Sequence, residues 1–254
     1  MSQQKIVATI EARMASSRLP GKVLLPLEQK NILWHLCERL KRVHSIDQII
    51  IATTVNPAED PIIEFAKENN IAYYRGSEED VLLRVLETAK SVNANIIVEI
   101  TGDCPLLDPD ITEQAIQTYC KLVKEKQIDY VSNVLKKGFP LGLAVQVFSY
   151  DLLNEVHSKT TDAEDREHVS LYIYKEKGRY KTHHIECPAW LNYPEWRWTL
   201  DYPEDYDFIK EVYTALYPTN PNFTSRDIVA HLKNSPQTLE LNANLQQHKP
   251  YVAE

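Results

Sequence analysis

Residues 5–22, KIVATIEARMASSRLPGK, join an apolar run to a loop rich in cations. The first part, Lys5–Ile10, is rich in β-branched residues and predicts a buried strand. The second part opens a loop over Arg13–Pro26, in which Pro20-Gly21 and Pro26 interrupt any regular element. The loop therefore follows the carboxyl end of a strand, which is where open α/β sheets bind their ligands.

Downstream of this loop, short apolar strands alternate with helical segments. Such alternation predicts right-handed βαβ crossovers and a mainly parallel sheet, and hence an α/β fold. We expect strands at Gln48–Thr54, Ala72–Arg75 and Ile96–Ile100, and helices at Ile32–Val43, Pro61–Asn69, Glu78–Val92 and from Asp108-Pro109 to Glu125. The last of these helices should have Asp108 as its N-cap and Pro109 at its first helical position.

The second half of the chain has strand candidates at wider spacing. They predict strands that complete the sheet in mixed orientation, together with a small β-rich lobe. The expected strands are Tyr130–Asn133, Leu143–Ser149, Tyr180–Glu186 and Arg197–Leu200, and the expected helices are Glu164–Lys175, Tyr202–Leu216 and Ser225–Leu232. We expect one domain over residues 1–254, in which the polar tail of about residues 235–254 has no firm structure.

Composition excludes several classes of function. The chain has 254 residues, of which 43% are hydrophobic, and a formal net charge of -8. Such a charge argues against a basic face for nucleic acid, so an anionic ligand needs a local group of cations. Four scattered cysteines fit a reducing compartment, and no run of apolar residues is long enough to span a bilayer. We therefore expect a soluble, cytoplasmic protein with no membrane partner.

The loop after the first strand supplies such a group of cations. Arg13, Arg18 and Lys22 lie in a stretch without acidic residues between Glu11 and Glu28. Guanidinium forks, an ammonium and serine hydroxyls suit a polyphosphate, although the loop has neither of the usual glycine-rich phosphate or dinucleotide patterns. The alternative is a solvated loop whose cations pair with neighbouring acids, and the residues alone leave both interpretations open.

Six short motifs occur in order along nearly the whole chain. They are R-x-x-S-S-R-L-P-G-K at 13–22, RGSEEDVL at 75–82, TGDCPL at 101–106, FPLGL at 139–143, REH at 166–168 and LDYPED at 200–205. The ordered set resembles the sugar-acid cytidylyltransferases, which include the CMP-sialic acid and 3-deoxy-manno-octulosonate enzymes. It is most similar to the spore coat polysaccharide biosynthesis subgroup.

The resemblance implies a Rossmann-like, three-layer αβα fold of the nucleotide-diphospho-sugar transferase type. It implies an enzyme that transfers CMP from CTP to a hydroxyl of a small anionic acceptor, such as a sugar acid, with pyrophosphate as leaving group. It further implies Mg²⁺ as cofactor and a homodimer.

Carried over by motif, the resemblance assigns the triphosphate to one loop and the metal to two aspartates. The triphosphate-binding residues are Arg13, Ser16, Arg18 and Lys22. Asp103 and Asp201 are the metal ligands, and together with Arg13 and Lys22 they form the expected catalytic set. Asp103 follows a strand at Thr101-Gly102 and offers a hard oxygen suited to Mg²⁺. From the residues alone, either aspartate could instead cap a turn or a helix.

The resemblance also places the nucleoside and the acceptor. Arg75, Ser77 and Arg84 correspond to a segment near the nucleobase and ribose, although Arg84 could equally be a surface helix arginine. The expected acceptor-binding residues are Asn133, Phe139, Gly142, Gln146, Arg166 and His168. Arg166 and His168 could meet a carboxylate or phosphonate of the acceptor, or simply lie on a solvated helix face.

Two other functions remain open at this point. A metal-dependent glycosyltransferase would need a D-x-D pattern, which occurs at Asp108-Pro-Asp110 and Asp205-Tyr-Asp207. Both patterns fall where a helix should begin, so we interpret them as helix caps. A non-catalytic nucleotide-binding scaffold in polysaccharide assembly is the third possibility. The presence of all the loop cations and both aspartates argues against it.

Overall fold

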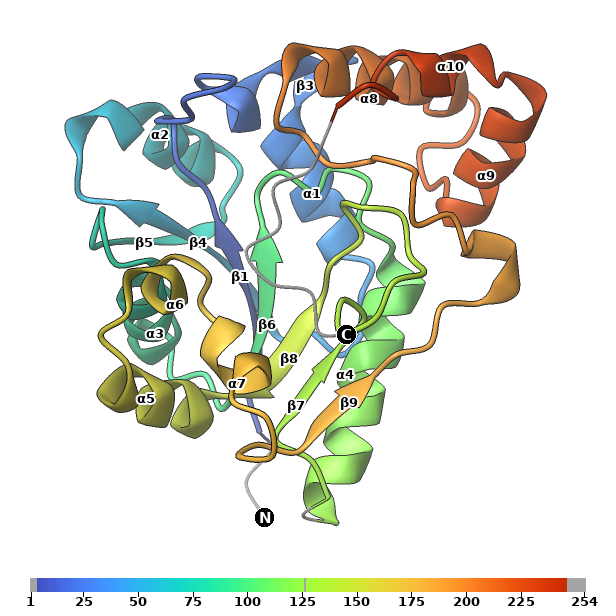
Figure 1. The fold of residues 1–254 in the computed structure, drawn as a ribbon. Helices are drawn as coiled ribbons and strands as arrows, with labels where there is room; N and C mark the ends of the chain where they lie inside the picture. The colour runs from blue at the N-terminus through green and yellow to red at the C-terminus, as the bar shows by residue number, and fades with distance from the viewer. Residues whose placement is uncertain (1–3, 126, 246–254) are drawn as a thin grey trace.

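A seven-stranded mixed sheet forms the centre of the protein (Figure 1). The computed structural model describes residues 4–125 and 127–245. The strand order is β5-β4-β1-β6-β8-β7-β9. The strands are β1 Ile6–Glu11, β4 Gln48–Thr54, β5 Ala72–Gly76, β6 Ile96–Thr101, β7 Tyr130–Ser132, β8 Gln146–Ser149 and β9 Thr182–His184. The four strands of the first half are parallel, whereas β8 runs antiparallel to both β6 and β7.

Helices connect and cover these strands. They are α1 Ile32–Leu40, α2 Asp60–Glu68, α3 Val81–Ser91, α4 Pro109–Lys124, α5 Tyr150–Lys159, α6 Ala163–Glu167, α7 Leu171–Lys175, α8 Pro203–Leu216, α9 Ser225–Asn234 and α10 Gln237–Glu240. Short 3-10 helices lie at Lys22–Leu24, Pro57–Glu59 and Ala189–Leu191, and a two-stranded ribbon pairs β2 Pro26–Leu27 with β3 Lys30–Asn31. None of the helices in the described part of the chain has the length and apolar character to cross a bilayer.

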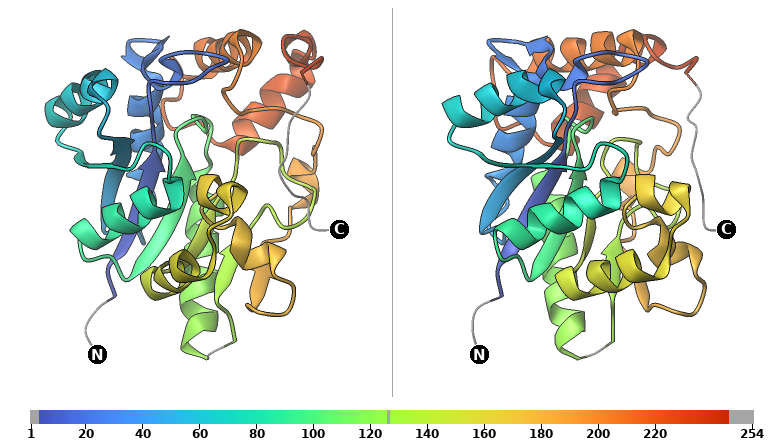
Figure 2. Two further views of the ribbon diagram at one scale, coloured as in Figure 1. Left: turned by 60° about the vertical axis from the view of Figure 1, so that its left-hand side comes forward. Right: turned by 90° about the vertical axis from the view of Figure 1, so that its left-hand side faces the viewer.

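Both faces of the sheet are buried, which gives the three layers expected for this fold class. Val7 of β1 packs in the core that contains residues of α3, α5 and α7, whereas its neighbour Ala8 packs in the core that contains residues of α1, α4 and α8. Ile97 and Val98 of β6 divide in the same way. Two side views show the helices on either side of the sheet (Figure 2). Strands covered on both faces are continuously apolar, which is the pattern that the sequence displays.

Helix starts follow the predicted caps. The Asp108 carboxylate accepts hydrogen bonds from the backbone N–H groups of Asp110 and Ile111, so α4 begins at Pro109 as expected. Asp205 is the third residue of α8 and accepts from the backbone N–H of Tyr202 in a capping box. Asp205 and Asp108, the leading aspartates of the two D-x-D patterns, are therefore used at helix N-termini.

Parts of the second half differ from the sequence-based expectation. The strands β7, β8 and β9 extend the central sheet, so the described residues do not form the separate β-rich lobe that we expected. Loops and the helices α5, α6 and α7 connect these strands to each other and to α8. The expected strand Arg197–Leu200 is an extended loop with one isolated bridge, from Arg197 to Leu141. The backbone N–H of Trp198 donates to the carbonyl of Leu141, whereas the N–H of Leu200 donates to the carbonyl of Asp103. The segment therefore does not form continuous β-pairing with one neighbouring strand.

Two helical predictions also need correction. The helix expected near Glu164–Lys175 is split into α6 and α7, because the backbone turns at His168 and Val169, where φ of Val169 is 21°. The tail after Ser235 contains the short helix α10 and a buried Asn242. Residues 246–254 of that tail lie outside the described residues.

Candidate active site

A polar pocket of about 290 Å³ opens at the carboxyl ends of β1 and β6. Its position matches the ligand-binding edge of open α/β sheets. The lining combines the loop after β1, the turn after β6 and residues of α3 and the α6–α7 region. The lining residues are Glu11, Ala12, Arg13, Ser16, Ser17, Arg18, Lys22, Val23, Val81, Arg84, Thr101, Gly102, Asp103, Glu167, His168 and Asp201.

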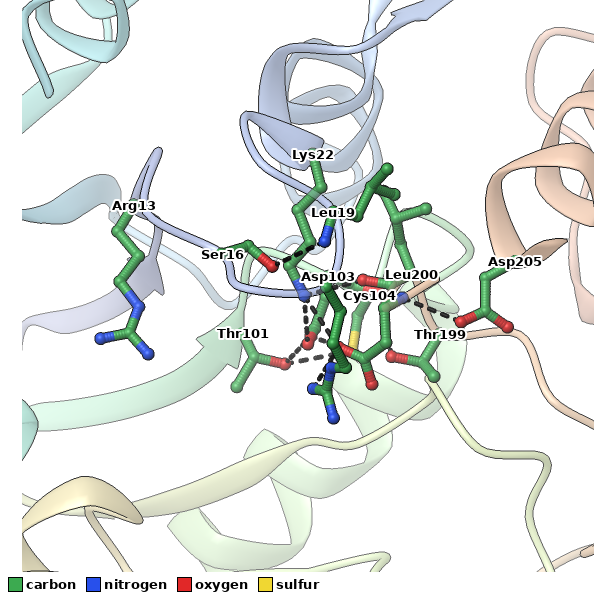
Figure 3. A network of polar contacts seen from close by, with 12 residues as sticks. Arg13, Ser16, Leu19, Lys22, Thr101, Asp103, Cys104, Thr199, Leu200 and Asp205 are labelled. Carbon is green, nitrogen blue, oxygen red and sulfur yellow. Dashed lines mark hydrogen bonds and ion pairs between the residues drawn. The ribbon is translucent and has the colours of Figure 1, made fainter. Parts of the chain in front are cut away.

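Lys22 joins the two predicted metal aspartates. Its Nζ lies 3.2 Å from Oδ2 of Asp103 and 2.9 Å from Oδ1 of Asp201, and donates to the carbonyl of Leu200 at 2.7 Å. Burial alone would lower the pKa of Lys22, but the two carboxylates outweigh burial and raise it. Figure 3 shows Lys22 reaching from its loop to Asp103. The ammonium is therefore charged and fixed between two acidic groups that come from distant parts of the chain.

The other loop cations also meet acidic side chains. Arg18 Nη2 lies 3.1 Å from Oδ1 of Asp201, and its guanidinium lies over the Tyr202 ring. Arg13 is half exposed and forms an ion pair of 3.3 Å with Glu167, and in Figure 3 it points away from the cluster around Asp103. Each predicted triphosphate-binding cation thus has a carboxylate partner in the structure.

Local hydrogen bonds shape the loop that carries these cations. Ser16 Oγ accepts from the backbone N–H of Leu19, and the buried Glu59 carboxylate accepts from the backbone N–H of Met14. The loop is thus tied both to itself and to the segment before α2. Ser16 therefore lines the pocket and also accepts a hydrogen bond within its own loop.

Asp103 is held at the edge of the sheet by its own turn. Thr101 Oγ1 donates to Oδ1 of Asp103 at 2.6 Å. Burial raises the pKa of this carboxyl, but Lys22 and the Thr101 hydroxyl outweigh burial and lower the pKa below its ordinary value. Gly102 is required here, since a Cβ at that position would lie 2.7 Å from the carbonyl oxygen of Glu11. The close approach of β6 to β1 therefore places an ionised carboxylate in the pocket.

Asp201 depends on a buried network behind it. Arg197 donates to both oxygens of Asp205, at 2.7 and 2.9 Å, and its Nη2 lies 3.2 Å from Oδ2 of Asp201. Asn242, from the tail, donates to the Arg197 carbonyl and to Asp205. This network fixes the carboxylate that faces Lys22 and Arg18.

The three residues predicted to lie near the nucleoside do not lie together in one pocket. Arg84 is buried at the pocket wall, where Nη1 donates to the carbonyl of Ser77 at 2.6 Å. Ser77 Oγ accepts from the backbone N–H of Asp80. Arg75 lies outside this pocket and donates to the carbonyls of Thr54, Val55 and Asn56, and its guanidinium pairs with Asp60. Of these three residues, Arg84 alone lines the pocket.

A second, larger pocket of about 630 Å³ is lined by three of the predicted acceptor residues. These are Asn133, Phe139 and Gly142. The Asn133 amide donates to the carbonyl of Leu143 and accepts from the N–H of Val145, which fixes the loop before β8. Gly142 has φ of 102°, and a Cβ there would lie 2.5 Å from the Thr199 nitrogen.

The other three predicted acceptor residues lie elsewhere. The Gln146 side chain is turned into the interior, where it donates to Glu99 and accepts from Ser170. Arg166 donates to the carbonyl of Thr160 and pairs with Asp80. Neither side chain lines the large pocket, and His168 lines the smaller one.

Among the charged residues, sequence reasoning missed two acidic side chains of the smaller pocket and one arginine behind it. Glu11 and Glu167 line the pocket, and Arg197 supports Asp201. A position directly before the cation loop could have marked Glu11, and the REH motif at 166–168 contains Glu167. No sequence signal connects Arg197 to the pocket. Within the described residues, no group of three or more His, Cys, Asp or Glu side chains is arranged to hold a metal ion. Asp103 and Asp201 are the carboxylates of this pocket that share a contact with Lys22 among the described residues.

The geometry agrees with comparisons to known proteins. The sequence profile of a family described as Cytidylyltransferase matches residues 7–244. The chain belongs to the cytidylyltransferase family. Membership makes it a nucleotidyltransferase, in agreement with a pocket that combines loop cations and paired aspartates.

Some relatives of this cytidylyltransferase match most of its length, and others match only part of it. The spore coat polysaccharide biosynthesis protein SpsF of Bacillus subtilis is 31% identical and covers 91% of this chain and 95% of its own length. A 3-deoxy-manno-octulosonate cytidylyltransferase of Pelobacter propionicus is 36% identical over 112 residues, which are 44% of this chain and 43% of that protein. A solved cytidylyltransferase structure from Leptospira borgpetersenii has a TM-score of 0.88 at 29% identity and covers 97% of this chain and 100% of its own. The last comparison also confirms the fold class.

Proposed function

We propose that this cytidylyltransferase transfers CMP from CTP to a hydroxyl of a sugar acid and releases pyrophosphate. The observation that carries the proposal is the convergence of Lys22, Asp103 and Asp201 beside a loop that also presents Arg13 and Arg18. Family membership supports CTP as the nucleotide. The 3-deoxy-manno-octulosonate relative supports a sugar acid as the acceptor.

The loop cations account for the electrostatic part of the reaction. As the acceptor hydroxyl attacks the α-phosphorus, negative charge develops on the non-bridging oxygens and on the departing pyrophosphate. Cations already fixed near those oxygens stabilise this charge without reorganising, and one such group typically contributes about 3–4 kcal/mol to the barrier. Arg13 and Arg18 are partly exposed, so each can exchange its carboxylate partner for a phosphate oxygen.

Mg²⁺ dependence is part of the same proposal. Mg²⁺ usually takes one or two protein carboxylates, and phosphate oxygens and waters complete its shell. Asp103 and Asp201 fit that requirement, because an oxygen of each converges on the same nitrogen of Lys22. When bound, the ion supplies positive charge to the phosphates. The chain's own contribution is to bring both carboxylates to one side of the pocket, where each contacts Lys22.

The acceptor belongs in the larger pocket. Its lining includes the exposed cations Lys136 and Lys137, of which Lys136 pairs with Glu186, together with the acidic Glu195. Lys137 is the cation that we expect to attract an anionic sugar. The pocket is large enough for a small molecule of this type. A homodimer is also part of this proposal, and sedimentation velocity measures it directly.

Pyrophosphate release tests the function. Purified protein is incubated with Mg²⁺, a panel of sugar acids and one nucleotide at a time from CTP, UTP, ATP and GTP. We expect pyrophosphate with CTP and at least one sugar acid, and loss of that signal in Asp103→Ala. Release with another nucleotide but not with CTP would contradict the proposed donor, and transfer from a UDP-sugar without pyrophosphate would indicate a glycosyltransferase.

A further inference from the structure

A small pocket of about 180 Å³ lies between α1, α8 and the turn that follows α8. It shares no lining residue with the two pockets described above. Its charged lining residues are Glu38, Arg39, Lys41 and Arg42. The chain as a whole is acidic, so a pocket in which cations outnumber acids requires an explanation.

Arg39 is a buried cation without an acidic partner. It exposes 4% of its surface, and no described carboxylate lies within ion-pair distance of its guanidinium. Its Nε atom donates to the Tyr213 hydroxyl, and Nη1 donates to the carbonyls of Leu107 and Phe223. Nη2 is buried and has no hydrogen-bond partner among the described residues, and the Phe223 ring 4.2 Å from Cζ offers a π face but no oxygen acceptor. Arginine is seldom fully buried unless it is paired, so the buried charge of Arg39 calls for a counter-charge.

Arg42 adds a second guanidinium three positions later. It is partly exposed, it donates to the carbonyl of Asn222 at 2.8 Å, and it has no ion pair with a described carboxylate. Burial and, after it, the charge of Arg39 lower the pKa of Arg42. The other two charges, on Lys41 and Glu38, pair with each other at 2.6 Å. The two guanidinium groups are therefore left for a ligand.

The ligand that fits this arrangement is a small oxyanion. A guanidinium presents its N–H donors as a planar fork that matches the oxygens of phosphate, and two forks can bind different oxygens of one group. The volume suits a ligand of that size, since pockets for drug-sized molecules are typically about 300–1,000 Å³. We propose that the pocket binds a phosphate-type oxyanion, orthophosphate or pyrophosphate, at Arg39 and Arg42. The bound anion supplies the counter-charge that the buried arginine lacks.

The same arginine connects the pocket to the segment that carries Asp103. Nη1 of Arg39 lies 3.3 Å from the carbonyl oxygen of Leu107. The Tyr213 hydroxyl, which accepts from Nε of Arg39, donates to the carbonyl of Pro105 at 2.9 Å. An oxyanion in this pocket therefore contacts a side chain that holds the backbone just after a residue of the candidate active site. Pyrophosphate, the product of the proposed transfer, is for this reason one of the two anions to test.

Calorimetric titration with orthophosphate, without CTP, tests the site independently of the proposed transfer. The full-length protein is titrated in EDTA at constant ionic strength as wild type, Arg42→Gln, Arg39→Lys and Lys22→Met. We expect Kd to rise by at least about tenfold in Arg42→Gln and Arg39→Lys, the effect typical of losing one hydrogen bond to a charged group. Arg42→Gln decides the test, because Arg42 is partly exposed, whereas Arg39→Lys also removes buried bonds that stabilise the fold. Lys22→Met should keep orthophosphate binding, since Lys22 lies in the other pocket.

A titration with pyrophosphate distinguishes the two sources of the anion. It is made in Lys22→Met, in which the cation loop is weakened as a competing site. Tighter binding of pyrophosphate than of orthophosphate would assign the pocket to the product of the transfer. Tighter binding of orthophosphate would assign it to free phosphate.

Arg226→Gln is the matched control, because Arg226 is exposed on α9 and lies over the Trp190 ring outside this pocket. It should bind orthophosphate as the wild type does. Absence of binding of both anions would overturn the proposal, as would a Kd that Arg42→Gln leaves unchanged. Equal weakening in Arg226→Gln and Arg42→Gln would assign the binding to general surface charge, and loss in Lys22→Met alone would assign it to the cation loop. Both of these results contradict the site.

Discussion

The Nζ atom of Lys22 lies 2.9 Å from Oδ1 of Asp201, although 179 positions of sequence separate the two residues. The contact joins the cation loop after the first strand to the segment just before α8. Because Lys22 also contacts Asp103, one ammonium fixes the distance between the two carboxylates of the pocket. The predictions below begin from this arrangement.

Replacement of Lys22 should remove a cation from the reacting phosphates. We expect Lys22→Met to lower kcat by about a hundredfold to a thousandfold, the effect typical of losing one fixed electrostatic group. Steady-state pyrophosphate release measures this change. Lys41→Met is the control, because Lys41 pairs with Glu38 on the surface. Similar losses in both variants would contradict a specific role for Lys22.

Replacement of Asp103 and replacement of Asp108 should have different effects on CTP binding. Asp103→Asn should abolish the Mg²⁺-dependent rise in melting temperature on addition of CTP, which for the wild type corresponds to about 2.7 kcal/mol at a hundredfold excess over Kd. Asp108→Ala loses a helix cap and should cost about 1 kcal/mol of stability. Its CTP-induced shift should persist. A lost shift in Asp108→Ala would revive the D-x-D interpretation.

The buried pair of Arg197 and Asp205 should dominate local stability. Both side chains are almost fully buried, so Arg197→Leu leaves Asp205 without its charge partner. We expect a loss of about 3–5 kcal/mol in the free energy of unfolding, measured with urea. The exposed pair of Arg179 and Glu155 provides the comparison, and Arg179→Leu should change stability little. Equal effects would show that Arg197 is not buried in solution as described.

Glu11 should make stability depend on pH. In the unfolded chain its carboxyl ionises near the ordinary pKa of 4.5, whereas in the folded protein burial raises the pKa to about 8. Between these values the folded state binds more protons, so Glu11 lowers the free energy of unfolding as pH rises. Glu11→Gln cannot ionise, and its melting temperature should rise relative to that of the wild type from pH 5 to pH 8. A constant difference over that range would contradict the raised pKa.

Replacement of Gly142 should weaken binding of the acceptor and leave binding of the nucleotide unchanged. An added Cβ would meet the Thr199 nitrogen at 2.5 Å, so Gly142→Ala must displace the loop over residues 139–143. We expect a higher KM for the sugar acid and an unchanged Kd for CTP. Gly178→Ala is the control, since a Cβ there meets no atom within 4 Å although its φ is also positive. A loss of CTP affinity in Gly142→Ala would mean that the two pockets are not separate sites.

The first half of the fold follows from local patterns in the sequence. The strand over Gln48–Thr54 was predicted with the bounds that the structure shows, and α4 begins where the Asp108-Pro109 pair predicts. Buried parallel strands produce continuous apolar runs, and caps produce short fixed patterns, so both are visible locally. The location of Lys22, Asp103 and Asp201 in one pocket followed from the same strand ends together with the family motifs.

The second half could not be predicted in the same way, because its geometry depends on distant partners. The segment Arg197–Leu200 alternates like a strand, yet its backbone bonds are divided between Leu141 and Asp103. The roles of Gln146 and Arg166 depend on the buried Glu99 and on Asp80, which the order of motifs does not reveal. Asn242 lies in a polar stretch whose composition gives no sign that the residue is buried.

Asn242 has a consequence for how the protein is made. Its amide bonds to the backbone of Arg197 and to the carboxylate of Asp205, the network that orients Asp201 towards Lys22. The ribosome synthesises the cation loop early. Asn242, which helps to align Asp201 with that loop, is added only after more than two hundred further residues. A nascent chain can bury its parallel strands early. We therefore expect the chain to lack activity until Asn242 has left the ribosome and can bond to Arg197 and Asp205.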